Sequence, residues 1–443
     1  MNEQAIMAPY LSRRAMLRST ALLGCSAALS GMPLASSAQA REASQWPRLN
    51  NMIDSYVGER KVANMVAALG WGTDAPEFVA EGDTSFTSAI PAGPDTLYRI
   101  YSMTKPVTGM ATMLCIEDGL LSLDQPIAEI LPAFAEMQVQ KTYDGAITPD
   151  NLENAERPIT VRHCLTHTAG LGYSIIQQGP IAQAYSENGL VPGLVSRLQM
   201  VPVFNGTPAS SLEQFADSLA KMPLVLQPGT RWSYSMGLDL MGRVIEVVSG
   251  KNFDAFLKER IFEPCGMDST GFRVPEGQAE RFTANYFVIN DVLLPIDIPG
   301  SSVFEEDPPF PFGGAGIVSS PRDYDRFLMM LANGGELDGV RVMDKATVEL
   351  ATSDMLPDTL DPGGGFTFGE NEFGFGAGGL VGKGQAEGLF GWFGAAGTCG
   401  LVNLRFGLRH NLMTQYMPAE TYPVYQDFPT TVAADAVAQL LNA

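Results

Sequence analysis

The stretch that decides the fold reads Ser102-Met103-Thr104-Lys105-Pro106, and apolar residues at helical spacing follow it. The apolar stripe consists of Val107, Met110, Ala111, Leu114 and Cys115. Because a proline is tolerated only in the first turn of a helix, this pattern predicts a helix that begins near Ser102 and stops at Gly119. Ser102 and Lys105 then lie one turn apart on the same face. In that position the amine can act as the base that makes the hydroxyl a nucleophile.

Two later segments carry residues that suit the same chemistry. Tyr234 follows the turn Pro228-Gly229 and precedes an expected helix, a place where a phenol can project into a cleft. The second segment lies near the C-terminus and reads Phe390-Gly391-Trp392-Phe393-Gly394-Ala395-Ala396-Gly397-Thr398. Its small residues would let the backbone of a strand approach a substrate closely.

Taken in order, these motifs resemble those of the serine β-lactamase and penicillin-binding-protein superfamily, and most of all the class C β-lactamase-related esterases. Ser102 to Lys105 resembles the S-x-x-K motif, and Tyr234-Ser235-Met236 the Y-x-N or Y-S-x motif. Trp392-Phe393-Gly394 resembles the W-G-G variant of the K-T-G motif. The resemblance covers about residues 50–440. It implies that Ser102 is the nucleophile and that Lys105 and Tyr234 move its proton, without deciding which of the two takes it.

The resemblance also implies the remaining parts of the site. The backbone N–H groups of Ser102 and Ala395 would form an oxyanion hole. Substrate-binding positions would be Met236, Trp392, Phe393 and Gly394. No metal or organic cofactor is expected.

Two departures from the family pattern bear on the substrate. Trp392 stands where β-lactamases have a carboxylate-binding lysine, and Met236 stands where they have an amide-binding asparagine. Both losses favour a neutral ester, and hence a carboxylesterase. The alternatives are a peptidase or amidase on small or D-residue peptides with weak β-lactamase activity, and a non-catalytic binding or sensor module with the same fold.

The order of expected elements predicts an α+β fold. Strands at both ends of the chain with helices between them suggest one antiparallel sheet flanked by helices, with an inserted, mostly helical lobe. The α/β lobe would comprise about residues 41–119 and 345–443, and the helical lobe about 120–344. The family that the chain resembles has this architecture, with the active site between the lobes.

Residues 1–40 are predicted to be a twin-arginine signal peptide. Arg13 and Arg14 precede a short apolar run, and Ala38-Gln39-Ala40 forms a cleavage site. The protein is therefore expected in the periplasm or outside the cell. A lipid anchor on Cys25 is the less favoured alternative, because the apolar run before this cysteine is very short.

The composition limits the partners. With a net charge of −21, the chain would repel nucleic acid and anionic membranes. We expect a small-molecule ester or amide as substrate, no nucleic acid and no stable membrane span, and the oligomeric state stays open. The cysteines outside the signal peptide are Cys115, Cys164, Cys265 and Cys399; they show no paired spacing, which favours buried free thiols over disulfides.

Three further patterns have a structural and a functional interpretation. His163 and His167 are four residues apart, but without a third ligand a structural turn is favoured over a metal site. The G-x-G-x-x-G run at 374–379 suggests a glycine-rich strand, because no helix follows it. The aromatic residues Phe304, Phe310 and Phe312 either pack on the core or form the apolar wall of an acyl pocket.

Overall fold

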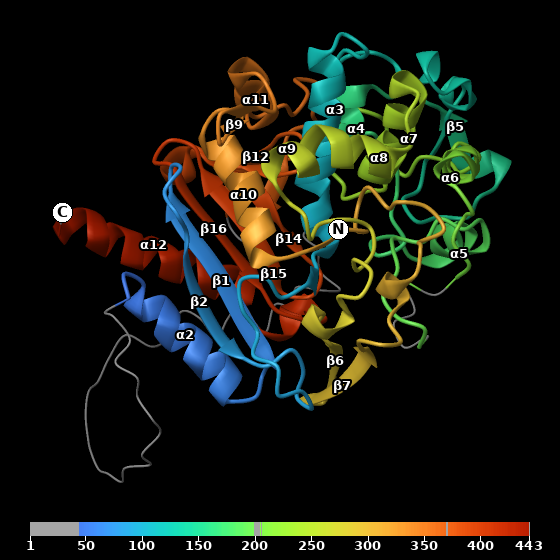
Figure 1. Ribbon diagram of the computed structural model, residues 1–443. Helices are drawn as coiled ribbons and strands as arrows, with labels where there is room; N and C mark the ends of the chain where they lie inside the picture. Colours follow the sequence, from blue (N-terminus) through green and yellow to red (C-terminus); the bar gives the residue numbers. More distant parts are fainter. Residues whose placement is uncertain (1–43, 199–203, 205, 369–370, 443) are drawn as a thin grey trace.

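The computed structural model describes residues 44–198, 204, 206–368 and 371–442, so the predicted signal peptide lies outside the described residues (Figure 1). Its centre is an eight-stranded sheet in the order β11-β12-β13-β14-β15-β16-β1-β2, with every neighbouring pair antiparallel. Two of its strands come from the N-terminal part, β1 (Asn64–Trp71) and β2 (Glu77–Gly82). The others are β11 (Phe366–Phe368), β12 (Asn371–Phe375), β13 (Leu380–Val381), β14 (Leu389–Gly394), β15 (Thr398–Asn403) and β16 (Leu408–Met413).

The two ends of the chain meet in this sheet, where Val66 of β1 pairs with Met413 of β16. Strand β1 is apolar along nearly its whole length because both of its faces are buried. Met65, Ala67 and Leu69 face the cluster formed with α2 (Pro47–Gly58) and α12 (Val424–Asn442), whereas Val66 faces the main core. Figure 1 shows α2 and α12 together on one side of the sheet.

The other face of the sheet carries α10 (Pro321–Ala332), which contacts β1, β15 and β16, and α3 (Thr104–Glu117), which contacts β14. Helix α10 falls within the range expected for the helical lobe, yet it packs on the sheet. Its side toward the sheet is apolar, and the buried pair Asp325–Arg409 joins it to β16. Local sequence does not show that this helix packs on the sheet, because the strands it contacts, β1, β15 and β16, are distant from it in the chain.

The inserted lobe between β2 and β11 consists of short helices and small ribbons. Its helices are α4 (Val161–Leu165), α5 (Gly179–Glu187), α6 (Leu212–Leu219), α7 (Gly237–Ser249), α8 (Phe253–Leu257), α9 (Glu263–Cys265) and α11 (Lys345–Ala351). Its ribbons are β3 (Tyr98–Arg99) with β8 (Val318–Ser319), β4 (Gln138–Gln140) with β5 (Leu152–Asn154), β6 (Asn285–Ile289) with β7 (Val292–Asp297), and β9 (Glu336–Leu337) with β10 (Val340–Arg341); β17 (Tyr416–Met417) adds to β6 in parallel.

The expected α+β architecture, an antiparallel sheet flanked by helices with an inserted helical part, is thereby confirmed. All four cysteines of the described part are buried free thiols, as predicted. No helix in the described ranges is long and apolar enough to span a bilayer. Among the same residues, no cluster of three or more His, Cys, Asp or Glu side chains is placed to hold a metal ion.

The glycine-rich run at 374–379 ends β12 and turns into β13, in agreement with the strand interpretation. Gly378 has φ +73°, and a Cβ there would lie 2.3 Å from the carbonyl oxygen of Lys105. Glycine is therefore needed for close packing of this turn on α3. Phe310 and Phe312 are buried and pack on each other with ring centroids 4.1 Å apart, so they belong to the core.

Candidate active site

Ser102 lies in a short 3₁₀ turn, Tyr101–Met103, directly before α3. The predicted start of the helix is thus correct to within two residues. Pro106 occupies the third position of α3, where its missing N–H leaves no hydrogen bond unmade. Tyr101, Met103 and Lys105 are buried, whereas Ser102 is only partly buried, so solvent reaches the hydroxyl but not its neighbours.

The amine of Lys105 is completely enclosed. Its Nζ donates to Ser102 Oγ at 3.2 Å and to the carbonyl oxygen of Gly314 at 2.7 Å. The same nitrogen lies 4.5 Å from the ring centre of Tyr234 and 5.3 Å from that of Tyr173. The lysine can therefore exchange a proton with Ser102 without contact with bulk water.

Tyr234 lies in the loop before α7, as predicted, and is 8% exposed. Its Oη accepts a hydrogen bond from Trp392 Nε1 at 3.1 Å. The ring packs against His167 and Tyr173, with centroids 4.7 and 5.4 Å away. The structure thus brings together Ser102, Lys105, Tyr234 and Trp392. The indole that replaces the lysine of the K-T-G motif holds the phenol oxygen by a neutral hydrogen bond.

Asp239 is a buried carboxylate beside this group that the sequence reasoning missed. It lies in the first turn of α7, and its Oδ1 accepts from the N–H of Gly314 at 2.8 Å, whereas its Oδ2 has no partner among the described residues. Burial raises the pKa of Asp239 to about 6, against the opposing effect of the nearby Lys105 charge. An acidic residue in the first turn of a helix is common, so no sequence pattern singled out Asp239.

The end of β14 lies directly against the chain that leads to Ser102. A Cβ on Gly394 would come within 2.2 Å of the carbonyl oxygen of Ile100, so only glycine permits this approach. Ala395 is the first residue of the turn between β14 and β15, and its N–H has no backbone acceptor in the described part of the chain. That N–H is available to an oxyanion beside Ser102.

Two predicted substrate-binding residues lie differently from the others. The side chain of Met236 is completely buried in the main core. The ring of Phe393 packs on Phe368 and Tyr425, with centroids 5.3 and 4.7 Å away, and not on Tyr234 as its neighbour Trp392 does. Successive side chains of a strand point to opposite faces, so the two rings, with centroids 6.2 Å apart, have different neighbours. Substrate contact by Met236 and Phe393 stays a prediction.

The two neighbouring histidines have separate structural surroundings. His163 Nδ1 accepts from the N–H of Thr160 and helps to cap α4. His167 has φ +55° and bonds through Nδ1 to Ser235, next to Tyr234. Burial and the charge of Lys105 hold the pKa of His167 well below its usual value. The His167 ring beside Tyr234 is therefore uncharged, and the cation over the Tyr234 ring is Lys105.

Comparison with known proteins bears on the identity of this site. The model of the family described as Beta-lactamase matches residues 49–426, which include Ser102, Lys105, Tyr234 and Trp392. The chain belongs to the β-lactamase family. This family is part of the serine β-lactamase and penicillin-binding-protein superfamily of serine hydrolases, in agreement with the resemblance seen in the motifs.

Similar proteins include both esterases and acyltransferases. Protein Rv1367c of Mycobacterium tuberculosis is 33% identical over 62% of this chain, and the match spans 64% of that protein's length. Esterase EstB of Burkholderia gladioli is 29% identical over 83% of this chain and 89% of its own. The structure of simvastatin synthase from Aspergillus terreus superimposes with a TM-score of 0.72 at 23% identity, covering 90% of this chain and 96% of that one.

Proposed function

We propose that this protein is an exported carboxylesterase that acts through an acyl-enzyme on Ser102. The observation that carries the proposal is the bond between Ser102 Oγ and the buried amine of Lys105, at 3.2 Å, below the ring of Tyr234. A partly exposed serine hydroxyl in direct contact with an enclosed amine that can exchange its proton is the arrangement that nucleophilic catalysis requires.

The reaction follows from these positions. Ser102 Oγ attacks the ester carbonyl carbon, and its proton passes to the Lys105–Tyr234 pair. The negative charge on the carbonyl oxygen is stabilised by the N–H groups of Ser102 and Ala395. When the tetrahedral intermediate collapses, the C–O bond to the alcohol breaks and the pair returns the proton to the leaving oxygen. Water then attacks the acyl-enzyme, releasing the acid and restoring Ser102.

A neutral ester fits the electrostatics of the site better than an anionic substrate. The amine of Lys105 is already bonded to Gly314 and Ser102, and Trp392 offers only a neutral donor, which Tyr234 accepts. The net charge of −21 also disfavours the approach of anions. The similarity to an esterase over most of the chain supports this choice.

The test is a substrate panel on the purified protein, containing p-nitrophenyl butyrate, nitrocefin and D-amino-acid anilides, together with labelling by a fluorophosphonate. We expect the ester to be the best substrate and the label to be found on Ser102 by mass spectrometry. A higher kcat/KM for the anilides would identify the amidase alternative. Absence of labelling and of all turnover would leave the non-catalytic module.

The export part of the proposal rests on Arg13 and Arg14, which precede the apolar run at residues 19–34. Replacing both by lysine keeps the charge but removes the arginine pair that the export machinery reads. Precursor should then accumulate in the cytoplasm. An unchanged periplasmic yield would argue against this route.

A further inference from the structure

The residue before the candidate nucleophile has an unfavourable backbone conformation. Tyr101 has φ +42°, in the left-handed region that a bulky side chain rarely adopts. Such a conformation persists only where the surroundings over-determine it, and it is concentrated at functional sites. Since Tyr101 is directly bonded to Ser102, whatever holds Tyr101 also sets the direction of the Ser102 hydroxyl.

The Tyr101 side chain is held by Asn285, which lies in the β6–β7 ribbon, far from Tyr101 in the sequence. Asn285 lies at the start of β6 and is completely buried. Its Nδ2 donates to Tyr101 Oη at 3.0 Å, and also approaches the sulfur of Met417 at 3.5 Å. The ring of Phe304 meets that of Tyr101 edge to face, with centroids 6.2 Å apart. The tyrosine is therefore fixed at its polar end and along its ring.

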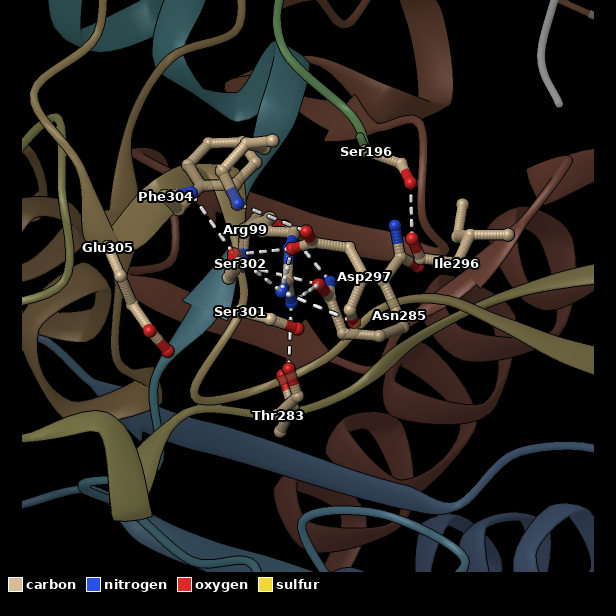
Figure 2. A network of polar contacts seen from close by, with 12 residues as sticks. Arg99, Ser196, Thr283, Asn285, Ile296, Asp297, Ser301, Ser302, Phe304 and Glu305 are labelled. Atoms are coloured by element: carbon tan, nitrogen blue, oxygen red, sulfur yellow. Dashed lines mark hydrogen bonds and ion pairs between the residues drawn. The ribbon is translucent and has the colours of Figure 1, made fainter. Parts of the chain in front are cut away.

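A buried ion pair fixes the chain just before Tyr101. Arg99 Nε donates to Asp297 Oδ2 at 2.9 Å, and Arg99 Nη1 donates to the carbonyl oxygen of Thr283 at 2.8 Å. Asp297 pairs with Asn285 across the β6–β7 ribbon, and it also accepts from Ser302 and from the N–H of Val303. Figure 2 shows Arg99 enclosed by Asp297, Ser302 and Thr283.

The backbone of Arg99 is held as firmly as its side chain. The amide of Gln415 donates to the carbonyl oxygen of Arg99 at 3.0 Å and accepts from its N–H at 3.3 Å. The β6–β7 ribbon thus supplies both Asn285, which donates a hydrogen bond to Tyr101, and the Asp297 carboxylate, which pairs with Arg99. Among the described residues, neither Asn285 nor Asp297 has a hydrogen bond to Ser102, whose side-chain bond is to Lys105.

We propose that Asn285 is a positioning residue, which holds Tyr101 in its left-handed conformation and thereby aims Ser102 Oγ at the carbonyl of the substrate. This inference rests on the proposed acyl-enzyme mechanism. The Arg99–Asp297 pair keeps the ribbon in register with the turn. Loss of the Asn285 bond lets Tyr101 relax toward a common conformation, and the hydroxyl then leaves its attacking position.

The experiment uses three variants of the full chain. Tyr101→Phe removes only the hydroxyl that Asn285 grips, and Asn285→Leu removes the donor at similar volume. Asn411→Leu is the matched control, because Asn411 is equally buried, donates one bond from Nδ2 to Pro321 at 3.0 Å, and has an unpartnered Oδ1, as Asn285 has. Thermal unfolding, kcat and KM for p-nitrophenyl butyrate, and the rate of fluorophosphonate labelling are measured for each.

Tyr101→Phe and Asn285→Leu should lower kcat and the labelling rate by on the order of tenfold to a hundredfold, the effect of a misplaced reacting group, with little change in KM. The control should lose stability without losing rate. The double variant should be no slower than the slower single variant, since both changes remove the same Asn285–Tyr101 hydrogen bond.

If Asn285 has a purely structural role, Asn285→Leu loses stability as Asn411→Leu does but keeps the wild-type kcat per labelled site. That result would overturn the inference. Independent effects that multiply in the double variant would also overturn it. If Asn285→Leu does not fold, Tyr101→Phe decides alone, because wild-type rates in that variant would show that the Asn285–Tyr101 hydrogen bond does not position Ser102. Failure to label the wild-type protein would instead refute the proposed function, and the inference with it.

Discussion

Two buried arginine–aspartate pairs of the same kind serve different parts of this molecule. Arg99–Asp297 lies just before the nucleophile turn, and Arg409–Asp325 joins β16 to α10, each with an Nε–Oδ distance of 2.9 Å. Both side chains of each pair are almost completely buried. The first carboxylate has partners on both oxygens, whereas Oδ2 of Asp325 has none among the described residues.

The difference teaches what each pair is for. A fully bonded pair fixes the position of its neighbours, and the neighbours of Arg99 lead to Ser102. A pair with one unpartnered oxygen constrains its neighbours less, and the other contacts of Arg409 are with the turn after β1, through the carbonyl oxygens of Gly72 and Asp74. We therefore expect the first pair to affect both activity and stability, and the second to affect stability alone.

The largest expected effect sets the reference for pure loss of activity. Ser102→Ala should reduce kcat by about 10⁴- to 10⁶-fold, as for other covalent nucleophiles, because no other hydroxyl of the described residues is bonded to Lys105. The unfolding temperature should stay close to that of the wild type, since a partly exposed side chain loses one atom. Near-full turnover in the purified variant would remove Ser102 from the mechanism.

The comparison itself is tested by Asp297→Asn and Asp325→Asn. Each change leaves a buried arginine without its counter-charge, which typically costs about 3–5 kcal/mol of the free energy of unfolding. Urea unfolding should show a loss of this size in both. Only Asp297→Asn should also lower kcat per folded molecule. Equal kcat values in the two variants would mean that the pair beside the nucleophile is merely structural.

The region around the Arg409–Asp325 pair should also make the free energy of unfolding depend on pH. His410, next to Arg409 on β16, is buried with both ring nitrogens unpartnered in the described structure, and burial lowers its pKa to about 4. The unfolded chain binds a proton on His410 near pH 6.5 and the folded chain does not, so His410 lowers the free energy of unfolding by up to about 3 kcal/mol as the pH drops from about 6.5 to about 4. His163 and His167, whose pKa values are also lowered by burial, act in the same direction.

His410→Leu should reduce the slope of the stability curve in this pH range by the share that His410 contributes, measured by urea unfolding at several pH values. Ser102→Ala is the control and should keep the wild-type slope. An unchanged slope in His410→Leu would show that the acid sensitivity comes from another group.

The smallest expected effect concerns the phenol of the site. Trp392→Phe keeps an aromatic ring but removes the donor to Tyr234 Oη. A neutral hydrogen bond contributes about 0.5–1.5 kcal/mol, so kcat for p-nitrophenyl butyrate should fall by roughly two- to tenfold, with little change in the unfolding temperature. An unaffected kcat would limit Trp392 to packing.

Local patterns revealed much of this molecule before its structure was known. The spacing of Ser102 and Lys105 lies within one helix turn, and the motifs around Tyr234 and Trp392 are continuous in sequence. The supporting groups were missed because their partners are distant: Asn285 meets Tyr101, and Asp297 meets Arg99, only in the folded chain. A charged residue at the end of a short strand, such as Arg99 or Asp297, cannot be told from a solvated one in the sequence. No pattern of residue types predicts the left-handed backbone conformation of Tyr101.

The pairing of β1 with β16 also dictates an order of assembly. Val66 finds its partner Met413 only after the helical insertion and strands β11 to β15 have been synthesised. The first strands must wait on the ribosome while the helical insertion between them and their partners emerges, and such long-range pairing makes folding slow. The turn that carries Ala395 arrives equally late. A nascent chain that ends before this turn therefore holds Ser102 and Lys105 but no complete active site, so synthesis must pass Ala395 before any substrate can be turned over.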